Sequence, residues 1–227
     1  MDYSNKKIAI LGGNGFIGAH CAQRLSERGA DVTCISRRGT RPAYLNNQDW
    51  ANAVHWCSGD AANLNPDSLS DYDAIVISIG SPPLPTLSKA AFDLQVFKNG
   101  TTCVKAIESA ADAGISRLVL IGANIPRPLK STKFGYYVGK QQALEAAQGF
   151  ASKANNQSVV LQPSVVTGKR KLNNGWTVHL DWLMSPASVL KPTHVCHVDR
   201  LANRVTKILL EDTAEKGSFG VIENRHI

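Results

Sequence analysis

The segment "KIAILGGNGFIG" (Lys7–Gly18) decides the fold, because it joins a short apolar run to glycines at a fixed spacing. Gly12, Gly15 and Gly18 form the pattern G-x-x-G-x-x-G. In such a loop the first glycine permits a tight turn, the second lets the backbone approach a pyrophosphate, and the third lets the next helix pack on the strand. The N-terminus of that helix then faces the phosphates. Since the motif lies between a strand and an amphipathic helix, it predicts a dinucleotide site and not merely a structural turn.

The rest of the chain alternates between apolar runs and helical patterns. The runs are rich in valine and isoleucine and lack strict alternation, as expected of strands that are buried on both faces. Strands and helices that take turns imply a parallel sheet covered on both sides. We therefore expect a single α/β domain over residues 1–227, a doubly wound Rossmann-type parallel sheet with a short C-terminal cap segment at residues 169–198. The expected strands are Lys7–Gly13, Asp31–Ser36, Ala53–Asp60, Asp73–Gly80, Arg117–Ala123 and Ser158–Ser164, and the expected helices are Phe16–Arg28, Phe92–Ala113 and Tyr136–Ala154.

The composition limits the function classes. The 227 residues are 43% hydrophobic and 19% charged, which suits one domain with a sizeable core. The net charge of +7 favours an anionic partner, namely a phosphate-bearing cofactor, nucleic acid or an acidic membrane. Lys and Arg are spread along the chain without a long basic run or a nucleic-acid-binding signature, so we expect no nucleic-acid partner.

The N-terminus and the cysteines bear on location. Because the first strand follows the start of the sequence at once, we expect no signal or transit peptide. No apolar run approaches the ~20 residues that span a bilayer. The five cysteines form no C-x-x-C pair, which indicates reduced thiols. A cytoplasmic location is expected, or the mitochondrial matrix if a transit peptide has been removed.

Three strand ends add to the cofactor prediction. Asp60 follows the third strand, where a carboxylate could accept from an adenine amino group, and Gly80 ends the fourth, where backbone passes close to a cofactor. Each residue alone is weak evidence for a cofactor site, since acidic residues and glycines often end strands. The second strand ends in Ser36, Arg37 and Arg38 with no acid. NAD enzymes commonly have an acid there for the ribose 2′-hydroxyl, whereas a guanidinium can grip a 2′-phosphate. The sequence thus predicts NADP(H), with NAD(H) less favoured; the alternative is a solvated basic turn.

The stretch "FGYYVGKQQALEAA" (Phe134–Ala147) carries a candidate proton-transfer pair. Tyr136 precedes Lys140 by about one helical turn, so both side chains share a face. A phenol beside an ammonium is a plausible proton donor and acceptor, although an exposed helix can carry such a pair by chance. Tyr137 has no such partner, because Gln141 stands four residues after it.

Together these motifs resemble the short-chain dehydrogenase/reductase superfamily, in its extended and atypical branches, which include sugar-nucleotide epimerases. "GGNGFIG" is similar to the cofactor loop, "YYVGK" to the Tyr-x-x-x-Lys pair, "LQPSVVTG" to the Arg-Pro-x-x-x-x-Gly strand and "HVCHVDRLANRVTKILLED" to the late Val-Asp-x-x-Ala helix. Within the superfamily the chain resembles an atypical group that contains the nucleotide-binding accessory subunit of respiratory complex I, plastid relatives and the ubiquinone-biosynthesis protein of yeast mitochondria.

The resemblance implies roles for individual residues. Tyr136 would donate or accept the proton while hydride moves to or from the nicotinamide. Lys140 would bind the nicotinamide ribose and lower the pKa of Tyr136 from its usual ~10. The catalytic set is Tyr136, Lys140 and Asn124. The cofactor set is Gly12, Asn14, Gly15, Phe16, Ile17, Gly18, Ser36, Arg37, Arg38, Asp60, Ala61, Ile79, Gly80, Asn99, Lys140, Pro163 and Ser164.

One departure from the family keeps two functions open. The Ser or Thr that usually ends strand five is replaced by Gly122 and Ala123, and Asn124 could supply a donor instead. Some members of the atypical group bind the nucleotide without demonstrated turnover. The chain is thus either an NADPH-dependent oxidoreductase or isomerase acting on a small apolar or quinone-like substrate, or a non-catalytic assembly or sensor protein linked to quinone biosynthesis or a respiratory complex.

Two later segments complete the sequence predictions. The segment 175–191 contains Trp176, Trp182, Leu183 and Met184, and would be a lid over substrate, a membrane or quinone surface, or a cover for the sheet edge.

In "THVCHVD", a strand would turn His197 away from His194 and Cys196. Helix N-capping explains Asp199, so no metal is expected.

Ser164 and Thr167 on strand six either contact substrate or nicotinamide, or simply finish the strand. Peripheral contact with a membrane or a protein complex is a further possibility, and the oligomeric state is open.

Overall fold

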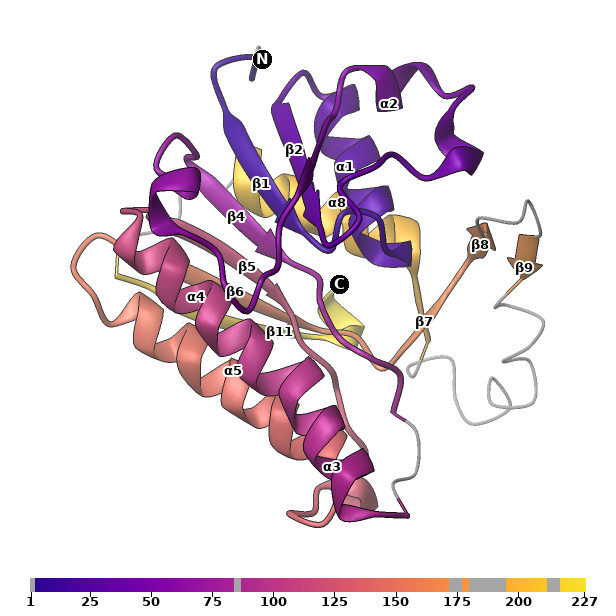
Figure 1. The fold of residues 1–227 in the computed structure, drawn as a ribbon, viewed down its shortest axis with the longest axis vertical. Helices are drawn as coiled ribbons and strands as arrows, with labels where there is room; N and C mark the ends of the chain where they lie inside the picture. Colours follow the sequence, from indigo (N-terminus) through magenta and orange to yellow (C-terminus); the bar gives the residue numbers. More distant parts are fainter. Residues whose placement is uncertain (1–2, 84–86, 172–176, 180–194, 212–216) are drawn as a thin grey trace.

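The computed structural model describes residues 3–83, 87–171, 177–179, 195–211 and 217–227. Its main sheet has seven strands in the order β11-β6-β5-β4-β1-β2-β3, and every neighbouring pair is parallel (Figure 1). This confirms the predicted doubly wound α/β fold. The strands of this sheet are β1 (Lys7–Leu11), β2 (Asp31–Ser36), β3 (His55–Ser58), β4 (Ala74–Ile77), β5 (Arg117–Ile121), β6 (Gln157–Gln162) and β11 (Phe219–Glu223).

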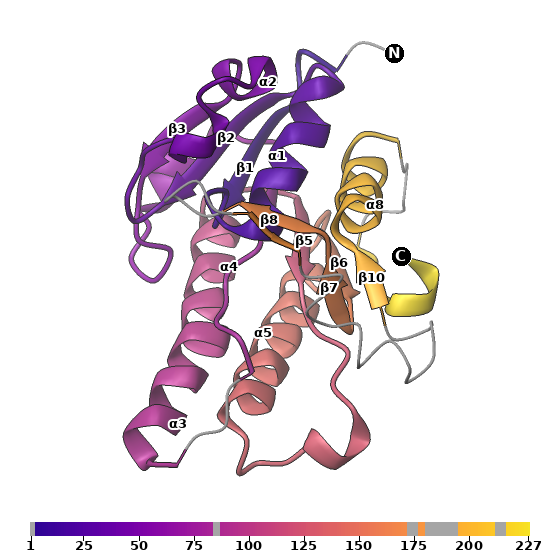
Figure 2. The same cartoon turned by 90° about the vertical axis from the view of Figure 1, so that its right-hand side faces the viewer.

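Helices cover both faces of the sheet, as Figures 1 and 2 show. Alternate residues of β1 enter two separate cores: Ile8 and Ile10 pack with the helices of one face, and Ala9 and Leu11 with those of the other. This explains the continuous apolar runs of the sequence, since neither face is left for polar side chains. One face carries α1 (Phe16–Glu27), α2 (Asp49–Asn52) and α8 (Val198–Leu210), and the other carries α4 (Thr102–Asp112) and α5 (Gly135–Ala151), with α3 (Lys89–Val96) leading into α4.

The strand order contains the topological switch point that positions the site. β1 lies between β2 and β4, so the chain runs outward through β2 to β3 and then crosses back to β4. In open α/β sheets, ligands bind in the crevice at the carboxyl ends of strands where the order reverses. The glycine loop after β1 and the ends of β4 and β5 therefore meet at one edge of the sheet.

The helix predicted over Phe92–Ala113 is interrupted. A π-helical segment, Phe97–Thr101, separates α3 from α4. It brings the backbone of Gly100 against α5, where an added Cβ would lie 2.7 Å from the Cα of Gly139. The π-helical turn contains the buried amide of Asn99. The hydrophobic periodicity of the sequence does not reveal this wider turn.

Several short elements were not predicted. The last strand, β11, pairs with β6 and completes the sheet. β6 ends at Gln162, so the prediction that Ser164 and Thr167 lie on the sixth strand is wrong. Ser164 lies between two strands, and Thr167 belongs to β7 (Val165–Thr167), which pairs with β10 (Val195–His197). β8 (Lys169–Lys171) forms an antiparallel pair with β9 (Thr177–His179).

Most of the predicted cap lies outside the described residues, including Trp176, Trp182, Leu183, Met184 and His194. Its lid role stays a prediction. None of the helices in the described parts of the chain is both long and apolar enough to cross a membrane.

Candidate functional site at the carboxyl ends of the strands

The glycine loop joins β1 to α1 through a turn that only glycines accommodate. Gly12 has φ +83°, and a Cβ there would lie 2.8 Å from the carbonyl oxygen of Ser78 at the end of β4. The amide of Gly15 donates to the carbonyl of Gly12 at 2.9 Å, and a Cβ on Gly18 would lie 2.3 Å from that same oxygen. Gly15 is the N-cap of α1 and has no side chain to occupy the first-turn N–H groups. The loop thus leaves space and backbone donors for an anion.

A further glycine of the loop was not singled out from the sequence. A Cβ on Gly13 would lie 2.3 Å from Sγ of Cys34 on β2. Gly13 therefore packs the loop onto the neighbouring strand. The doubled glycine "GG" was the signal, but only the three-dimensional neighbour explains it.

Asn14 ties the glycine loop to the segment after β2. Its Nδ2 donates to the carbonyl of Thr40, while its Oδ1 is buried without a hydrogen-bond partner among the described residues. A buried acceptor of this kind costs free energy unless it is satisfied. A ribose hydroxyl is a donor that fits it.

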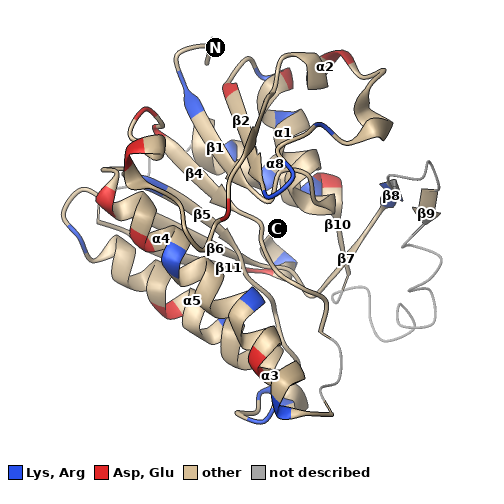
Figure 3. Ribbon diagram, in the orientation of Figure 1, with Lys and Arg blue, Asp and Glu red and all other residues tan. Residues whose placement is uncertain are grey.

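The ends of β2 and β3 carry the predicted adenosine contacts. Ser36 Oγ accepts from the Gly39 amide at 3.3 Å, and the Ser36 carbonyl accepts from Gly59 at 3.0 Å. Arg37 and Arg38 follow and are exposed, and the loop after β2 is basic in Figure 3.

Asp60 caps its own turn, because its carboxylate accepts from the Ala62 amide at 3.1 Å and from Asn63 Nδ2 at 3.2 Å. It is exposed, and each carboxylate oxygen has a second lone pair for another donor. Ala61 beside it packs against the core between the sheet and α4, as does Ile79.

The loop after β4 is fastened from behind by Asn99. This side chain is 0% exposed. Its Oδ1 accepts from the Ser81 amide at 3.0 Å, and its Nδ2 donates to Ser81 Oγ at 2.9 Å and to the Gln95 carbonyl at 3.0 Å. Asn99 therefore positions the backbone at Gly80 and Ser81, and direct contact with a cofactor stays a prediction.

Lys140 reaches from α5 to the ends of β4 and β5. Its Nζ donates to the Ile121 carbonyl at 3.1 Å and lies 3.4 Å from where a Cβ on Gly80 would stand. Desolvation lowers the pKa of Lys140, and the neighbouring thiol of Cys103 opposes that shift. An ammonium that is this poorly solvated favours an additional polar partner.

Tyr136 lies one turn before Lys140 on the same helix face, with Lys140 Nζ 5.9 Å from the centroid of its ring. The expected lowering of its pKa is wrong for this structure, since burial raises the pKa of Tyr136 to about 12. The cause is desolvation, because burial penalises the charged phenolate.

The ends of β5 and β6 form the remaining wall. The amide of Asn124 donates to the carbonyl of buried Pro163 at 2.8 Å, so the two strand ends stay paired. Gly122 suits this place, because a Cβ on it would approach Val160 Cγ1 to 3.0 Å.

Ser164 is held through its amide by the Oδ1 of Asn224 at 3.0 Å. Asn224 is a buried residue near the C-terminus, and no sequence motif marked it. The described contacts of Ser164 fix its backbone, so its role toward substrate stays a prediction.

His197 and Asp199 lie at the start of α8. The prediction that Asp199 is the N-cap is wrong, because α8 begins at Val198 and His197 Nδ1 accepts from the Asp199 amide at 3.3 Å. Asp199 lies in the first turn of α8, where its carboxylate interacts favourably with the helix dipole. Its Oδ1 lies 3.4 Å from Nη2 of Arg24. The described residues hold no group of three or more His, Cys, Asp or Glu side chains arranged for a metal ion.

A dinucleotide fits this arrangement. The side-chain-free turn at Gly12 and Gly15, the orphaned Oδ1 of Asn14 and the ammonium of Lys140 all belong to the carboxyl-end side of β1, β4 and β5. These groups would hold a pyrophosphate, a ribose hydroxyl and a second ribose in turn.

Comparisons with known proteins agree with this fold. The sequence model of the NAD dependent epimerase/dehydratase family matches residues 8–180. The chain is 34% identical over 189 residues to At1g32220 of Arabidopsis thaliana, an uncharacterized chloroplastic protein, covering 82% of this chain and 58% of that protein. It is 30% identical over 161 residues to MIOREX complex component 2 of Saccharomyces cerevisiae, covering 67% of this chain and 52% of that protein. The chain therefore spans about half the length of the curated relatives it matches.

Solved structures share the architecture at low sequence identity. A short-chain dehydrogenase/reductase from Serratia marcescens has a TM-score of 0.73 at 18% identity, covering 100% of this chain and 99% of that chain. UDP-glucuronic acid 4-epimerase from Bacillus cereus, solved with UDP-glucuronic acid and NAD, has a TM-score of 0.73 at 17% identity, covering 96% and 76%. The chain belongs to the NAD dependent epimerase/dehydratase family.

Proposed function

We propose that this chain binds a nicotinamide dinucleotide in the crevice at the ends of β1, β4 and β5, prefers NADP(H), and reduces or isomerises a small apolar or quinone-like substrate. Tyr136 is its proton donor, Lys140 holds the nicotinamide ribose, and Asn124 is the donor that helps to orient the substrate oxygen.

The observation that carries the proposal is the position of Lys140. An ammonium has three N–H donors, and the hydrogen bond described for it uses only the Ile121 carbonyl. The backbone of Gly80 passes beside this ammonium, since a Cβ added there would lie 3.4 Å from Lys140 Nζ. Ribose hydroxyls would take the remaining donors and would restore the polar environment that burial removes.

The protonation state of Tyr136 favours one direction of reaction. With a pKa of about 12, its phenol stays protonated near neutral pH, so it can donate a proton but is a poor acceptor. The nicotinamide supplies or accepts hydride when it is bound. Tyr136 then protonates the developing alkoxide or phenolate of a reduced carbonyl, and the charge of Lys140 stabilises the phenolate that remains.

The preference for NADP(H) rests on Arg37 and Arg38. Both are exposed at the end of β2, where an acid would repel a 2′-phosphate. MoeE5 and the Bacillus cereus epimerase were solved with NAD, at 19% and 17% identity, so these relatives give the fold and not the cofactor choice.

A second function has its own support. Gly122 and Ala123 lack the hydroxyl that the resemblance leads one to expect, and the yeast relative is named as a component of a complex. The chain would then bind the nucleotide as a structural or sensing part of an assembly, with peripheral contacts to a membrane or to other proteins.

Turnover separates the two functions. NADPH oxidation is measured under single-turnover conditions with a panel of short-chain quinones and small ketones, for the wild type, Tyr136→Phe and the matched control Tyr137→Phe. The enzyme proposal predicts a rate that falls about 10²–10⁴-fold in Tyr136→Phe and stays within threefold in Tyr137→Phe. NADPH binding without turnover on any panel member supports the second function, and equal rates in all three proteins refute the role of Tyr136.

A further inference from the structure

A cavity of about 280 Å³ lies between α1 and the segment that carries η1 (Ala43–Leu45) and α2. Its walls include Asn14 and Gly15 of the glycine loop, so it opens beside the predicted pyrophosphate site. Three cationic side chains line it, from separate parts of the chain: Arg38, Lys169 and Arg170. The described lining residues include no carboxylate. The cavity therefore favours an anion next to the adenosine end of a dinucleotide.

Gly168 brings β8 to this cavity. It has φ +129°, a conformation that only glycine adopts readily, and a Cβ there would lie 2.8 Å from Val198 Cγ1 and 3.4 Å from Phe16 Cζ. The chain thus passes directly over the first residue of α1. Lys169 and Arg170 follow at once, and Figure 2 shows β8 beside the start of α1.

The opposite wall comes from the loop after β2. The hydrogen bond from Asn14 to the Thr40 carbonyl holds this loop against the glycine loop. Tyr44, from the segment after β2, lines this cavity together with Arg170 of β8. The loop after β2 and β8 are both basic in Figure 3. Arg38 and Arg170 therefore face one cavity from two sides.

We propose that Lys169 and Arg170 complete a 2′-phosphate subsite opposite Arg38, so that the segment after β7 takes part in selecting NADP(H) over NAD(H). This inference rests on the proposed function. A 2′-phosphate monoester carries nearly two negative charges at neutral pH. Guanidinium groups from two directions can bind its oxygens with charge-assisted hydrogen bonds, and the first turn of α1 adds its dipole. Because NADH lacks this phosphate, Lys169 and Arg170 of β8 add nothing to its binding affinity.

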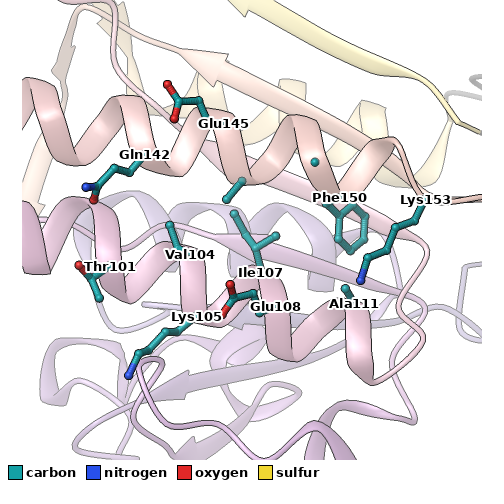
Figure 4. Close-up of a pocket in the computed structure, with 12 residues that line it drawn as sticks. Thr101, Val104, Lys105, Ile107, Glu108, Ala111, Gln142, Glu145, Phe150 and Lys153 are labelled. Carbon is teal, nitrogen blue, oxygen red and sulfur yellow. The ribbon is translucent and has the colours of Figure 1, made fainter.

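The test compares cofactor affinities by isothermal titration calorimetry for wild type, Lys169→Ala/Arg170→Ala and the milder Arg170→Gln. The probes are NADPH, NADH, 2′,5′-ADP and 5′-ADP. The control, Lys105→Ala/Lys153→Ala, removes the same charge from the groove between α4 and α5, on the other face of the sheet (Figure 4). Thermal unfolding verifies that each variant is folded.

The β8 double variant should bind NADPH and 2′,5′-ADP about 5- to 20-fold more weakly, with NADH and 5′-ADP changed less than twofold. Arg170→Gln should show part of the same selective loss even if the double variant does not fold. Equal losses for phosphorylated and unphosphorylated probes, unchanged NADPH affinity, or the same loss in the control would overturn the inference.

Failure of the proposed cofactor preference would look different. A wild type with no preference for NADPH contradicts the proposed function itself. A wild-type preference that disappears in Arg37→Ala/Arg38→Ala but persists in Lys169→Ala/Arg170→Ala contradicts only the role of β8.

Discussion

Replacing Asn99 by alanine should weaken both the fold and the crevice. The buried amide makes three hydrogen bonds, to the amide and hydroxyl of Ser81 and to the carbonyl of Gln95. At a net ~1 kcal/mol each, their loss sums to about 3 kcal/mol. Water can replace the partners of half-buried Ser81 in part, so we expect the free energy of unfolding to fall by about 2–3 kcal/mol.

Urea unfolding followed by circular dichroism measures the loss. With a slope of about 3 kcal/mol per M, the midpoint should fall by about 0.7–1 M. NADPH should also bind at least fivefold more weakly, because the loop at Gly80 loses its support. The control Asn63→Ala removes one exposed hydrogen bond to Asp60 and should change stability by less than about 0.5 kcal/mol. If Asn99→Ala matches the control in both midpoint and NADPH affinity, the supporting role of Asn99 is refuted.

Three further predictions follow from single contacts. Gly12→Ala forces a side chain into a φ of +83° against Ser78 and should lower NADPH affinity at least tenfold in titration calorimetry. Gly149→Ala, whose Cβ meets open space in α5, should stabilise the protein by about 0.5–1 kcal/mol. Equal effects of the two substitutions on NADPH affinity would refute the loop argument. Because burial raises the pKa of Tyr136 to about 12, difference absorbance of wild type minus Tyr136→Phe should show no tyrosinate below about pH 10.5; ionisation near pH 8 without cofactor would contradict this. Arg117→Ala removes donors to the carbonyls of Leu209 and Ile208, at 2.9 and 2.8 Å, and should cost about 2 kcal/mol in urea unfolding, against little change for exposed Arg225→Ala.

The sequence predicted the parts of the fold that depend on local pattern. The runs at Lys7–Leu11 and Asp31–Ser36 are apolar on both faces, and they form neighbouring parallel strands. The helix after the glycine loop begins at Phe16 as expected. Other strands end earlier than predicted. Ser78 and Gly122 continue the strand pattern in the sequence, but β4 ends at Ile77 and β5 at Ile121.

What the sequence did not reveal depends on distant partners. β11 is a short run after α8, and its place beside β6 only becomes evident once the sheet exists. The π-helical turn at Asn99 arises with contacts to Ser81 and to α5. The pKa of Tyr136 was predicted in the wrong direction because a motif records which residues are near one another, while the pKa depends on how far water is excluded.

The central claim is that a nicotinamide dinucleotide binds with its reactive end at Lys140. A crystal structure of the chain with NADP⁺ tests it most directly. We expect the pyrophosphate at the Gly12–Gly18 loop and a nicotinamide-ribose hydroxyl within about 3.2 Å of Lys140 Nζ, beside Tyr136. A dinucleotide bound elsewhere, or one whose nicotinamide ribose points away from Lys140, would contradict the account.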